Sequence, residues 1–472
     1  MKMYLSGEWI DGQNNMPVFN PYDESVIDTV PRAGLDELEK AMASASRGAA
    51  VMAKTPGYER FEMLRKAADL LEERTEEFAR IITLEEGKVI AEARAEVGRA
   101  VQTISLSGEE AKRLYGETIP LDGAPAWAGQ LGFTIRVPCG VVVAISPFNF
   151  PLNLVCHKVG PALAAGNSVV IKPASDTPLS ALKLTEVLIE AGVPIEAVQC
   201  ITGSGGEIGD ALVSDPRVRK VTFTGSRDIG ERICGRAGLK KVTMELGSNS
   251  PLIVMPDADI EKVVRATVSS GFSNAGQVCI SAQRVIANEK IYSDYLEVLK
   301  DEVNEITVGN PLDENVKMGP MVRSQDSIRV NNWINEAINT GARKVVGGDY
   351  SGAVHQATVV ADVDPRMKIS CEELFGPAVA VTPFGDIDEA ISMANDTNYG
   401  LSAGIFTQNL DWAMQFARDV DSGNIMINSG PQWRADLMPY GGLKDSGMAK
   451  EGPKYAVEEM TELKMIVYHP SV

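Results

Sequence analysis

Short apolar runs and longer amphipathic segments alternate along this chain, and the alternation predicts an α/β protein. Near the N-terminus, three segments carry apolar side chains at helical spacing: residues 36–52, 59–83 and 88–115. From residue 141 the pattern becomes regular, with predicted strands at 141–145, 168–171, 198–201, 220–223 and 241–245. Predicted helices separate these strands, at 151–165, 180–191, 206–213 and 228–237. Continuous apolar strands joined by helices indicate a parallel sheet covered on both faces, in a doubly wound arrangement.

The second half of the chain repeats this style. We predict strands at 358–360, 378–382, 402–406 and 424–427, and helices at 259–273, 291–303, 387–394 and 411–420. The segment 118–138 differs, because prolines and glycines interrupt it before the alternating run 133–137. This excursion is typical of a hairpin that lies outside the main sheets.

A last alternating strand at 463–468 has no obvious partner in the sequence. It could pair with residues 133–137 or with another subunit. Exposed strand edges promote aggregation, so proteins usually cover them. We therefore expect the excursion and the C-terminal tail to meet across a subunit boundary, in a homodimer or homotetramer.

These patterns divide the chain into three parts. We expect residues 1–117 and 139–247 to form a doubly wound, Rossmann-like α/β domain that binds a dinucleotide cofactor. Residues 248–442 are expected to form a second α/β domain, which carries the catalytic chemistry. Residues 118–138 and 443–472 would form a small β excursion that bridges subunits.

Composition narrows the possible functions. The chain has 472 residues, of which 44% are hydrophobic, enough to bury the cores of two or three domains. A net charge of −19 disfavours nucleic acid and an anionic membrane surface as partners, because both attract basic proteins. No apolar run approaches the length of a membrane span, and the start of the chain is typical of a short strand.

The numbers of cysteines and histidines also narrow the possible functions. The 6 cysteines form no CxxC pair and there are only 3 histidines, so neither a zinc site nor a disulfide framework is expected. We expect a reduced, cytoplasmic enzyme without a metal.

One cysteine and one glutamate carry the candidate chemistry. Cys279 lies in the run 276–281 and Glu245 in the run 244–251. A thiolate can form a covalent thioester with an oxidised aldehyde, and a nearby carboxylate can activate the water that hydrolyses it. Either residue alone says little, because most cysteines are packing residues. Together and in this order, the two motifs closely resemble the active-site signatures of the aldehyde dehydrogenase superfamily.

The resemblance extends over essentially the whole chain, through the stretches 147–151, 160–167, 171–174, 223–226, 372–377 and 439–447. One departure is Ser248, where the family usually has glycine. The resemblance implies that Cys279 attacks the aldehyde, that Asn149 and the Cys279 backbone N–H stabilise the oxyanion, and that Glu245 activates water. Lys158 resembles the position that relays protons from this carboxylate.

The resemblance also implies NAD or NADP as the hydride acceptor. The positions that match cofactor-binding residues are Ile145, Ser146, Pro147, Phe148, Lys172, Ser175, Gly209, Gly225, Ser226, Leu246, Glu373 and Phe375. The glycine-rich run 203–209 alone is a weak fingerprint, since a glycine turn between a strand and a helix has the same pattern.

Position 175 bears on the choice between the two cofactors. NAD-preferring relatives tend to have a glutamate there, which accepts from the ribose 2′-OH and repels a 2′-phosphate. Ser175 removes the repulsion and Lys172 supplies positive charge, although Asp176 is adjacent. We predict NADP use or dual specificity.

Four residues are candidates for substrate contact: His157, Asn153, Trp433 and Arg434. A histidine and an arginine would suit a small polar aldehyde, and this set resembles the lactaldehyde and glyceraldehyde dehydrogenase-like branch. The alternative is a purely structural role, in which Arg434 forms a salt bridge elsewhere and His157 packs in the interior. Val278 stands where phosphonoacetaldehyde dehydrogenases have an arginine, which argues against a phosphonate.

The same motifs leave three alternative functions: oxidation of a semialdehyde such as succinate or glutarate semialdehyde, CoA-acylating oxidation, and a non-catalytic protein on this fold. CoA-acylating relatives lack the water-activating glutamate, so Glu245 argues against the second.

Overall fold

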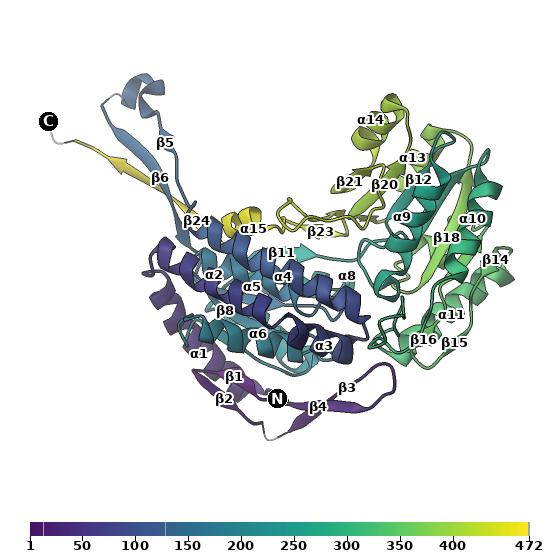
Figure 1. Ribbon diagram of the computed structural model, residues 1–472. Helices are drawn as coiled ribbons and strands as arrows, with labels where there is room; N and C mark the ends of the chain where they lie inside the picture. Colours follow the sequence, from purple (N-terminus) through teal and green to yellow (C-terminus); the bar gives the residue numbers. More distant parts are fainter. Residues whose placement is uncertain (13, 128, 471–472) are drawn as a thin grey trace.

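Two α/β bodies and a projecting β arm make up the chain in a computed structural model, which describes residues 1–12, 14–127 and 129–470 (Figure 1). The first body is built on an eight-stranded sheet. Its strands, in spatial order, are β2 (Glu8–Ile10), β1 (Met3–Leu5), β9 (Val198–Cys200), β8 (Ser168–Lys172), β7 (Val141–Ile145), β10 (Val218–Thr224), β11 (Lys241–Glu245) and β23 (Gly447–Met448). The five strands from β7 to β11 pair in parallel, and β1 and β23 pair antiparallel with β9 and β11.

This sheet is doubly wound, as predicted. Strand β7 lies between β8 and β10, so the strand order reverses there, and ligands bind at such a switch point beside the carboxyl ends of the strands. Buried side chains of Val142 and Ile171 face one hydrophobic cluster, whereas those of Val143 and Val170 face another. Helices cover both faces: α1 (Leu35–Met52), α2 (Gly57–Glu73), α3 (Thr75–Glu86), α4 (Ile90–Ala111), α5 (Asn153–Ala164), α6 (Leu179–Glu190), α7 (Gly205–Ser214) and α8 (Arg227–Ala237).

The predicted helix 59–83 is wrong in one respect, because the structure divides it into α2 and α3. Arg74 ends one helix and begins the next, with φ −102° and ψ 21°. The hydroxyl of Thr75 donates to the carbonyl of Glu72 at 2.7 Å, and such a local side-chain bond competes with helical pairing. The hairpin of β3 (Asn15–Phe19) and β4 (Val26–Pro31) was not predicted.

The second body contains a seven-stranded sheet. Its order is β14 (Arg343–Val346), β17 (Thr358–Ala361), β18 (Ala378–Phe384), β13 (Arg284–Asn288), β12 (Pro251–Val254), β20 (Ser402–Phe406) and β21 (Asn424–Ile427). Its helices are α9 (Ile260–Phe272), α10 (Tyr292–Asn304), α11 (Ser324–Asn339), α12 (Lys368–Cys371), α13 (Ile387–Asn395) and α14 (Leu410–Asp419). All four predicted strands are present, but the central strands β12 and β13 were not predicted. Short two-residue pairs complete the body: β15 (Tyr350–Ser351) with β16 (Val354–His355), and β19 (Tyr399–Gly400) with β22 (Leu443–Lys444).

The arm is a three-stranded sheet of β24 (Thr461–Tyr468), β6 (Leu131–Pro138) and β5 (Thr118–Ile119), which points away from both bodies (Figure 1). Strand β24 pairs antiparallel with β6 along its whole length. The expectation that the excursion and the tail meet across a subunit boundary is therefore wrong, because they pair within one chain. The rest of the tail is not part of the arm, since β23 joins the first sheet and α15 (Pro453–Glu459) packs on α4 and α5.

The three-part division at residues 117, 138, 247 and 442 stays a prediction. Among the described residues, no helix is both long enough and apolar enough to cross a membrane.

Candidate active site

The candidate nucleophile lies on a loop with an unusual backbone path. After α9, the 3-10 turn Ser273–Gly276 places Asn274 and Ala275 at φ 50° and 52°, and Gly276 follows at φ +68°. A Cβ atom at Gly276 would lie 2.1 Å from a carbonyl oxygen of the facing loop, so only glycine fits. This tight turn brings Cys279, half-buried, to the wall of a cavity.

Asn149, the predicted oxyanion donor, is buried in the loop after β7. Its amide Nδ2 donates to the carbonyl of Gln277, 2.8 Å away and two positions before Cys279. Its backbone carbonyl accepts from Nζ of Lys88 at 2.8 Å and from Nδ2 of Asn274 at 3.2 Å. The amide is therefore held against the nucleophile loop, where a donor to an oxyanion is needed.

Lys88 is buried in the connection between α3 and α4 and forms an ion pair with Glu96. Its Nζ also lies 3.9 Å from the ring centroid of Phe150. Oε1 of Glu96 accepts the backbone N–H groups of Leu152 and Asn153 at 3.0 and 3.1 Å. One buried ion pair thus fixes both the carbonyl of Asn149 and the start of α5.

Glu245 ends β11, and its side chain is buried. Neither carboxyl oxygen has a hydrogen-bond partner among the described residues. Burial, followed by the charge of Glu451, raises the pKa of Glu245 to about 8. A carboxyl group with free lone pairs and a pKa near neutrality suits a general base.

The surroundings of the Cys279 thiol oppose its ionisation. Burial raises its pKa well above the usual value, and the charge of Glu245 raises it further. The hydroxyl of Tyr440 lies 3.4 Å from Sγ. Ionisation of Cys279 therefore depends on its neighbours.

Lys158, on α5, is fully buried. Its Nζ donates to the hydroxyl of Thr224 at 2.6 Å and to Oε1 of Glu451 at 2.9 Å. Burial opposes ionisation of Glu451, but Lys158 and Arg434 hold the pKa of that carboxyl well below its usual value. The predicted relay residue therefore lies in a buried ionic cluster that adjoins Glu245.

A cavity of about 340 Å³ leads to Cys279. Three of the four predicted substrate residues, Asn153, Trp433 and Arg434, line it, and Trp433 is 57% exposed. His157 does not line it, because it is buried behind Arg434. The residues that line the cavity also include Arg99 and four serines, Ser269, Ser270, Ser273 and Ser429.

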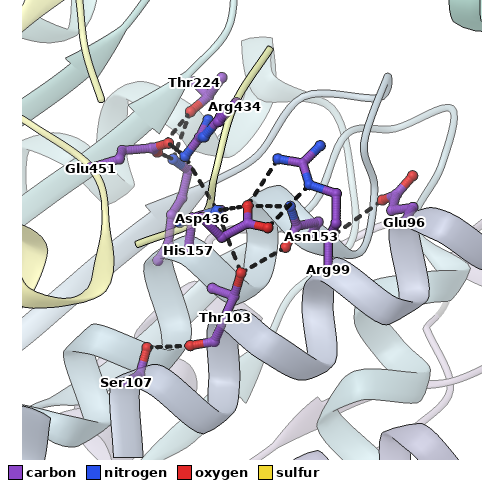
Figure 2. Close-up of polar contacts among 11 residues, drawn as sticks. Glu96, Arg99, Thr103, Ser107, Asn153, His157, Thr224, Arg434, Asp436 and Glu451 are labelled. Atoms are coloured by element: carbon purple, nitrogen blue, oxygen red, sulfur yellow. Dashed lines mark hydrogen bonds and ion pairs between the residues drawn. The ribbon is translucent and has the colours of Figure 1, made fainter. Parts of the chain in front are cut away.

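Figure 2 shows the polar network beneath this wall. Arg99 donates to both oxygens of Asp436, at 3.1 Å from Nε and 2.8 Å from Nη2. The same carboxylate contacts Nε2 of His157 at 2.9 Å and accepts from Nδ2 of Asn153 at 3.2 Å. Nη2 of Arg434 lies 3.2 Å from Nε2 of His157 and 3.1 Å from Oε2 of Glu451. The network joins the cavity wall to the ionic cluster around Lys158.

The charges of this network follow from burial. Burial, with the charge of Arg434 second, lowers the pKa of His157 to about 4. Burial opposes ionisation of Asp436, but hydrogen bonds from His157 and Arg99 hold its pKa far below the usual value. At neutral pH, His157 is therefore uncharged and acts as a spacer between Asp436 and Arg434. Both alternatives for this pair, a salt bridge of Arg434 and packing of His157, describe part of the arrangement.

The predicted cofactor residues gather at the carboxyl ends of β7, β8, β10 and β11. Lys172 ends β8, is buried, forms no ion pair among the described residues, and has a pKa lowered to about 8 by burial. The hydroxyl of Ser175 donates to the carbonyl of Gly203 at 3.2 Å. Asp176 is bound by Arg323, whose Nε lies 3.1 Å away. Asp176 is therefore neutralised by a partner of its own.

The loop after β7 and the loops after β10 and β11 form the rest of this crevice. Ile145 and Ser146 lead from β7 to Pro147 and Phe148, and Oγ of Ser146 is buried without a partner among the described residues. Gly225 donates to the carbonyl of Glu245 at 3.1 Å, and Ser226 precedes α8 without a capping side-chain bond. Leu246 donates to the carbonyl of Ser446, and Gly209 on α7 has open space beside its Cα.

Glu373 and Phe375 approach the crevice from the second body. Oε1 of Glu373 accepts the backbone N–H of Ser248 at 2.9 Å, and burial raises its pKa to about 7. A Cβ at Gly247 would lie 2.4 Å from the carboxylate of Glu373, so a side chain there would displace that carboxylate, whereas Ser248 bonds to Ser250 at 3.1 Å. The ring of Phe375 packs edge-on against Phe148, with centroids 5.8 Å apart.

These residues fit a dinucleotide. An unpaired lysine, the free N–H groups at the start of α8 and an orphaned serine hydroxyl are the donors that ribose and phosphate oxygens require.

Several site residues were missed from the sequence: Arg99, Asp436 and Glu451, together with Lys88, Glu96, Gln277 and Tyr440. Tyr440 stood in a quoted motif, but its contact with Cys279 spans 161 positions. Lys158 and Glu451 are 293 positions apart, and no local pattern marks such a pair.

Known proteins with similar sequences and structures support an aldehyde dehydrogenase active site. The model of the aldehyde dehydrogenase family matches residues 9–466. The chain is 49% identical to a 3-sulfolactaldehyde dehydrogenase of Priestia aryabhattai over 98% of this chain and 97% of that one. It is 38% identical to a lactaldehyde dehydrogenase of Methanococcus maripaludis over 99% and 100% of the two chains. A crystal structure of glyceraldehyde-3-phosphate dehydrogenase from Methanocaldococcus jannaschii, complexed with NADP, superposes with a TM-score of 0.93 at 37% identity and covers 96% of this chain and 98% of that one. The resemblance in the sequence is confirmed: the chain belongs to the aldehyde dehydrogenase family and is an NAD(P)-dependent aldehyde dehydrogenase.

Proposed function

We propose that this enzyme oxidises a small, anionic hydroxyaldehyde to its carboxylate, and that it uses NADP at least as well as NAD. The observation that carries the proposal is the cavity that ends at Cys279, with Arg99 and Arg434 in its wall. Two of the relatives above are named for anionic three-carbon aldehydes, one a sulfonate and one a phosphate. The cavity's serine hydroxyls suit a hydroxyl group on the substrate.

The first half of the reaction takes place at Cys279. Its thiolate adds to the aldehyde carbon, and the carbonyl oxygen becomes an oxyanion. Nδ2 of Asn149 exchanges its bond to Gln277 for one to this oxyanion, together with the backbone N–H of Cys279. Removal of one such donor typically costs ~10²–10³ in rate. The bound nicotinamide supplies the acceptor for the hydride that leaves the same carbon.

The second half is hydrolysis of the thioester. Glu245 takes a proton from water, the hydroxide oxygen adds to the thioester carbon, and the C–S bond breaks. Free oxygens and a raised pKa support this role. The buried ion pair of Lys158 and Glu451 supports a role for Lys158 in passing the proton onward.

The anionic group of the substrate is expected to bind at Arg99. Two of its nitrogens hold Asp436, but the described residues offer no partner to Nη1, and the side chain is 32% exposed. A sulfonate, carboxylate or phosphate oxygen can accept a hydrogen bond from this Nη1 group. Arg434 is 6% exposed and already bound to Glu451, so it serves mainly to position the wall.

Cofactor choice is expected to depend on the end of β8. Ser175 carries no charge, Lys172 is a cation without an ion-pair partner, and Arg323 neutralises Asp176. Nothing described at this edge repels a 2′-phosphate, so NADP is admitted alongside NAD.

The arm supports assembly into a homodimer or homotetramer. Strand β24 is the edge strand of the arm, and its side chains Leu463, Met465, Val467 and Tyr468 are between 40% and 58% exposed. An apolar edge of this kind needs a cover, and a second copy supplies one.

A substrate panel tests the proposal: 3-sulfolactaldehyde, lactaldehyde, glyceraldehyde and succinate semialdehyde, each with NADP and NAD, with and without CoA. We expect the free acid as product whether or not CoA is present, and the highest kcat/KM for an anionic hydroxyaldehyde. Arg99→Gln should lower kcat/KM for sulfolactaldehyde at least ~10-fold and change that for lactaldehyde less than about threefold. Arg94→Gln, on the same helix but outside the cavity, is the matched control.

A preference for succinate semialdehyde would favour the semialdehyde alternative. Acyl-CoA as the product would favour CoA-acylating oxidation, and no turnover of any aldehyde would favour a non-catalytic protein.

A further inference from the structure

The nucleophile has a hydrogen-bond partner that the proposed reaction does not yet use. Oη of Tyr440 lies 3.4 Å from Sγ of Cys279, and both side chains line the cavity. Tyr440 is 1% exposed, and the sulfur is the partner of its hydroxyl among the described residues. A buried phenol requires such a partner, since an unsatisfied one is costly.

Two contacts fix the position of this phenol. The backbone of Tyr440 pairs with that of Glu451 in both directions, at 3.1 and 2.7 Å. The guanidinium carbon of Arg434 stacks over the ring, 3.7 Å from its centroid. The backbone pairing fixes the main chain of Tyr440, and the stacked guanidinium restrains its ring, so the hydroxyl cannot turn away from the sulfur without losing the contact with Arg434.

The chemistry of the pair depends on the charge of the sulfur. A thiol is a weak donor and a weak acceptor, whereas a thiolate only accepts, and it accepts most strongly from an O–H group. Burial raises the pKa of Tyr440 well above its usual value, so the phenol keeps its proton. The hydrogen bond of Tyr440 and the charge of Arg434 both oppose the effect of burial on the pKa of Cys279.

We propose that the hydroxyl of Tyr440 is a catalytic donor that stabilises the thiolate of Cys279, with Arg434 strengthening the donor through its stacking on the ring. Ionisation moves the thiol proton to solvent, and Tyr440 keeps its own proton. When the sulfur then bonds to the aldehyde carbon it loses its charge, and the hydrogen bond weakens. The inference rests on the proposed role of Cys279 as nucleophile.

Tyr440→Phe tests this, because it removes the hydroxyl and retains the ring that Arg434 covers. The measurement is the rate of alkylation of Cys279 by iodoacetamide from pH 6 to pH 10, followed by mass spectrometry of the peptide that contains this residue. Below the pKa of the thiol this rate rises with the thiolate fraction, and we expect the rising limb of the profile to shift to higher pH by about one to two units. Tyr295→Phe is the matched control, since it removes a buried phenol that bonds to Thr267 far from the sulfur.

A rising limb that shifts by less than about 0.3 pH units from wild type, in a variant with unchanged circular dichroism and NADP binding, would overturn the inference. Failure of the proposed function is a different result: Cys279 of the wild type would then react no faster than Cys139, Cys234 or Cys371, which are also half-buried.

Discussion

Nζ of Lys88 donates a hydrogen bond to the backbone carbonyl of Asn149 at 2.8 Å, from a position 61 residues earlier in the chain. The amide of the same asparagine faces the nucleophile loop through Gln277. The buried ammonium of Lys88 therefore holds the backbone of Asn149, whose amide is the group proposed to stabilise the oxyanion. An error of about 1 Å in such a group can cost ~10² in rate.

Lys88→Met should lower kcat by roughly 10- to 100-fold with little change in KM for NADP, because the change loosens Asn149 without touching the cofactor. Steady-state kinetics of Lys88→Met, Asn149→Ala and the double variant check this. Both residues act through one amide, so the two effects should not add. Fully additive effects, or a kcat within about twofold of wild type, would show that Lys88 serves only stability.

Ser175→Glu should shift cofactor preference toward NAD by at least roughly tenfold, about 1.4 kcal/mol, because its carboxylate repels a 2′-phosphate. Ser175→Gln is the control, because glutamine has nearly the size of glutamate but no charge. It separates charge repulsion of the 2′-phosphate from steric crowding. The measurement is kcat/KM with both cofactors. Strong NAD preference in wild type, or equal loss of both cofactors in the variant, would place the determinant elsewhere.

Acid should destabilise the protein through His157. Its pKa is about 4 in the folded state and 6.5 in the reference state, so between these values only the unfolded chain binds the proton. The stability that the neutral imidazole contributes is complete above pH 6.5 and is lost as pH falls toward 4, with about 2 kcal/mol lost at pH 5.

Urea unfolding at pH 7.5 and pH 5 measures this loss. His157→Gln should lose about 2 kcal/mol less than wild type between the two pH values. His469→Gln should behave like wild type, since His469 is exposed. Equal losses in all three proteins would show that His157 is not the titrating group.

The double variant Leu463→Lys, Val467→Lys should be monomeric, because it places charge on the exposed edge strand of the arm while β24 keeps its backbone pairing with β6. Sedimentation velocity at micromolar concentration checks this. A monomeric wild type would contradict the proposed homodimer or homotetramer. An oligomeric double variant would show that the interface between subunits lies outside β24.

The parallel core of the first sheet could be predicted because β7 and most of β8 are apolar, β-branched runs and because helical segments separate its strands regularly. Strands β12 and β13 could not, since one begins with Pro251 and the other with Arg284. The guanidinium of Arg284 is buried and donates to three backbone carbonyls, those of Asn249, Met393 and Ala394. That compensation depends on tertiary structure, so the local sequence gives no sign that an arginine belongs in the core.

In the candidate site, too, some residues are marked by local sequence motifs and others depend on tertiary structure. Cys279, Glu245 and Asn149 stand in short motifs, so the sequence predicts them. Asp436 and Glu451, which hold the cavity wall and Lys158, lie in the C-terminal part of the chain and reach the site only through the fold. The assignment of His157 to the substrate followed from its position next to Lys158, but in the structure the side chain packs behind the cavity wall.

The central claim is covalent catalysis by Cys279 with hydrolysis by Glu245, and the mass of a trapped intermediate tests it most directly. Glu245→Gln should form the thioester and stop, because hydride transfer precedes the step that needs the carboxylate. Intact-protein mass spectrometry after mixing with aldehyde and NADP should show the added mass of one acyl group on Cys279, alongside a stoichiometric burst of NADPH. The variant Glu245→Gln, Cys279→Ala should show neither. A burst without an adduct on Cys279, or the absence of both in Glu245→Gln, would contradict the account.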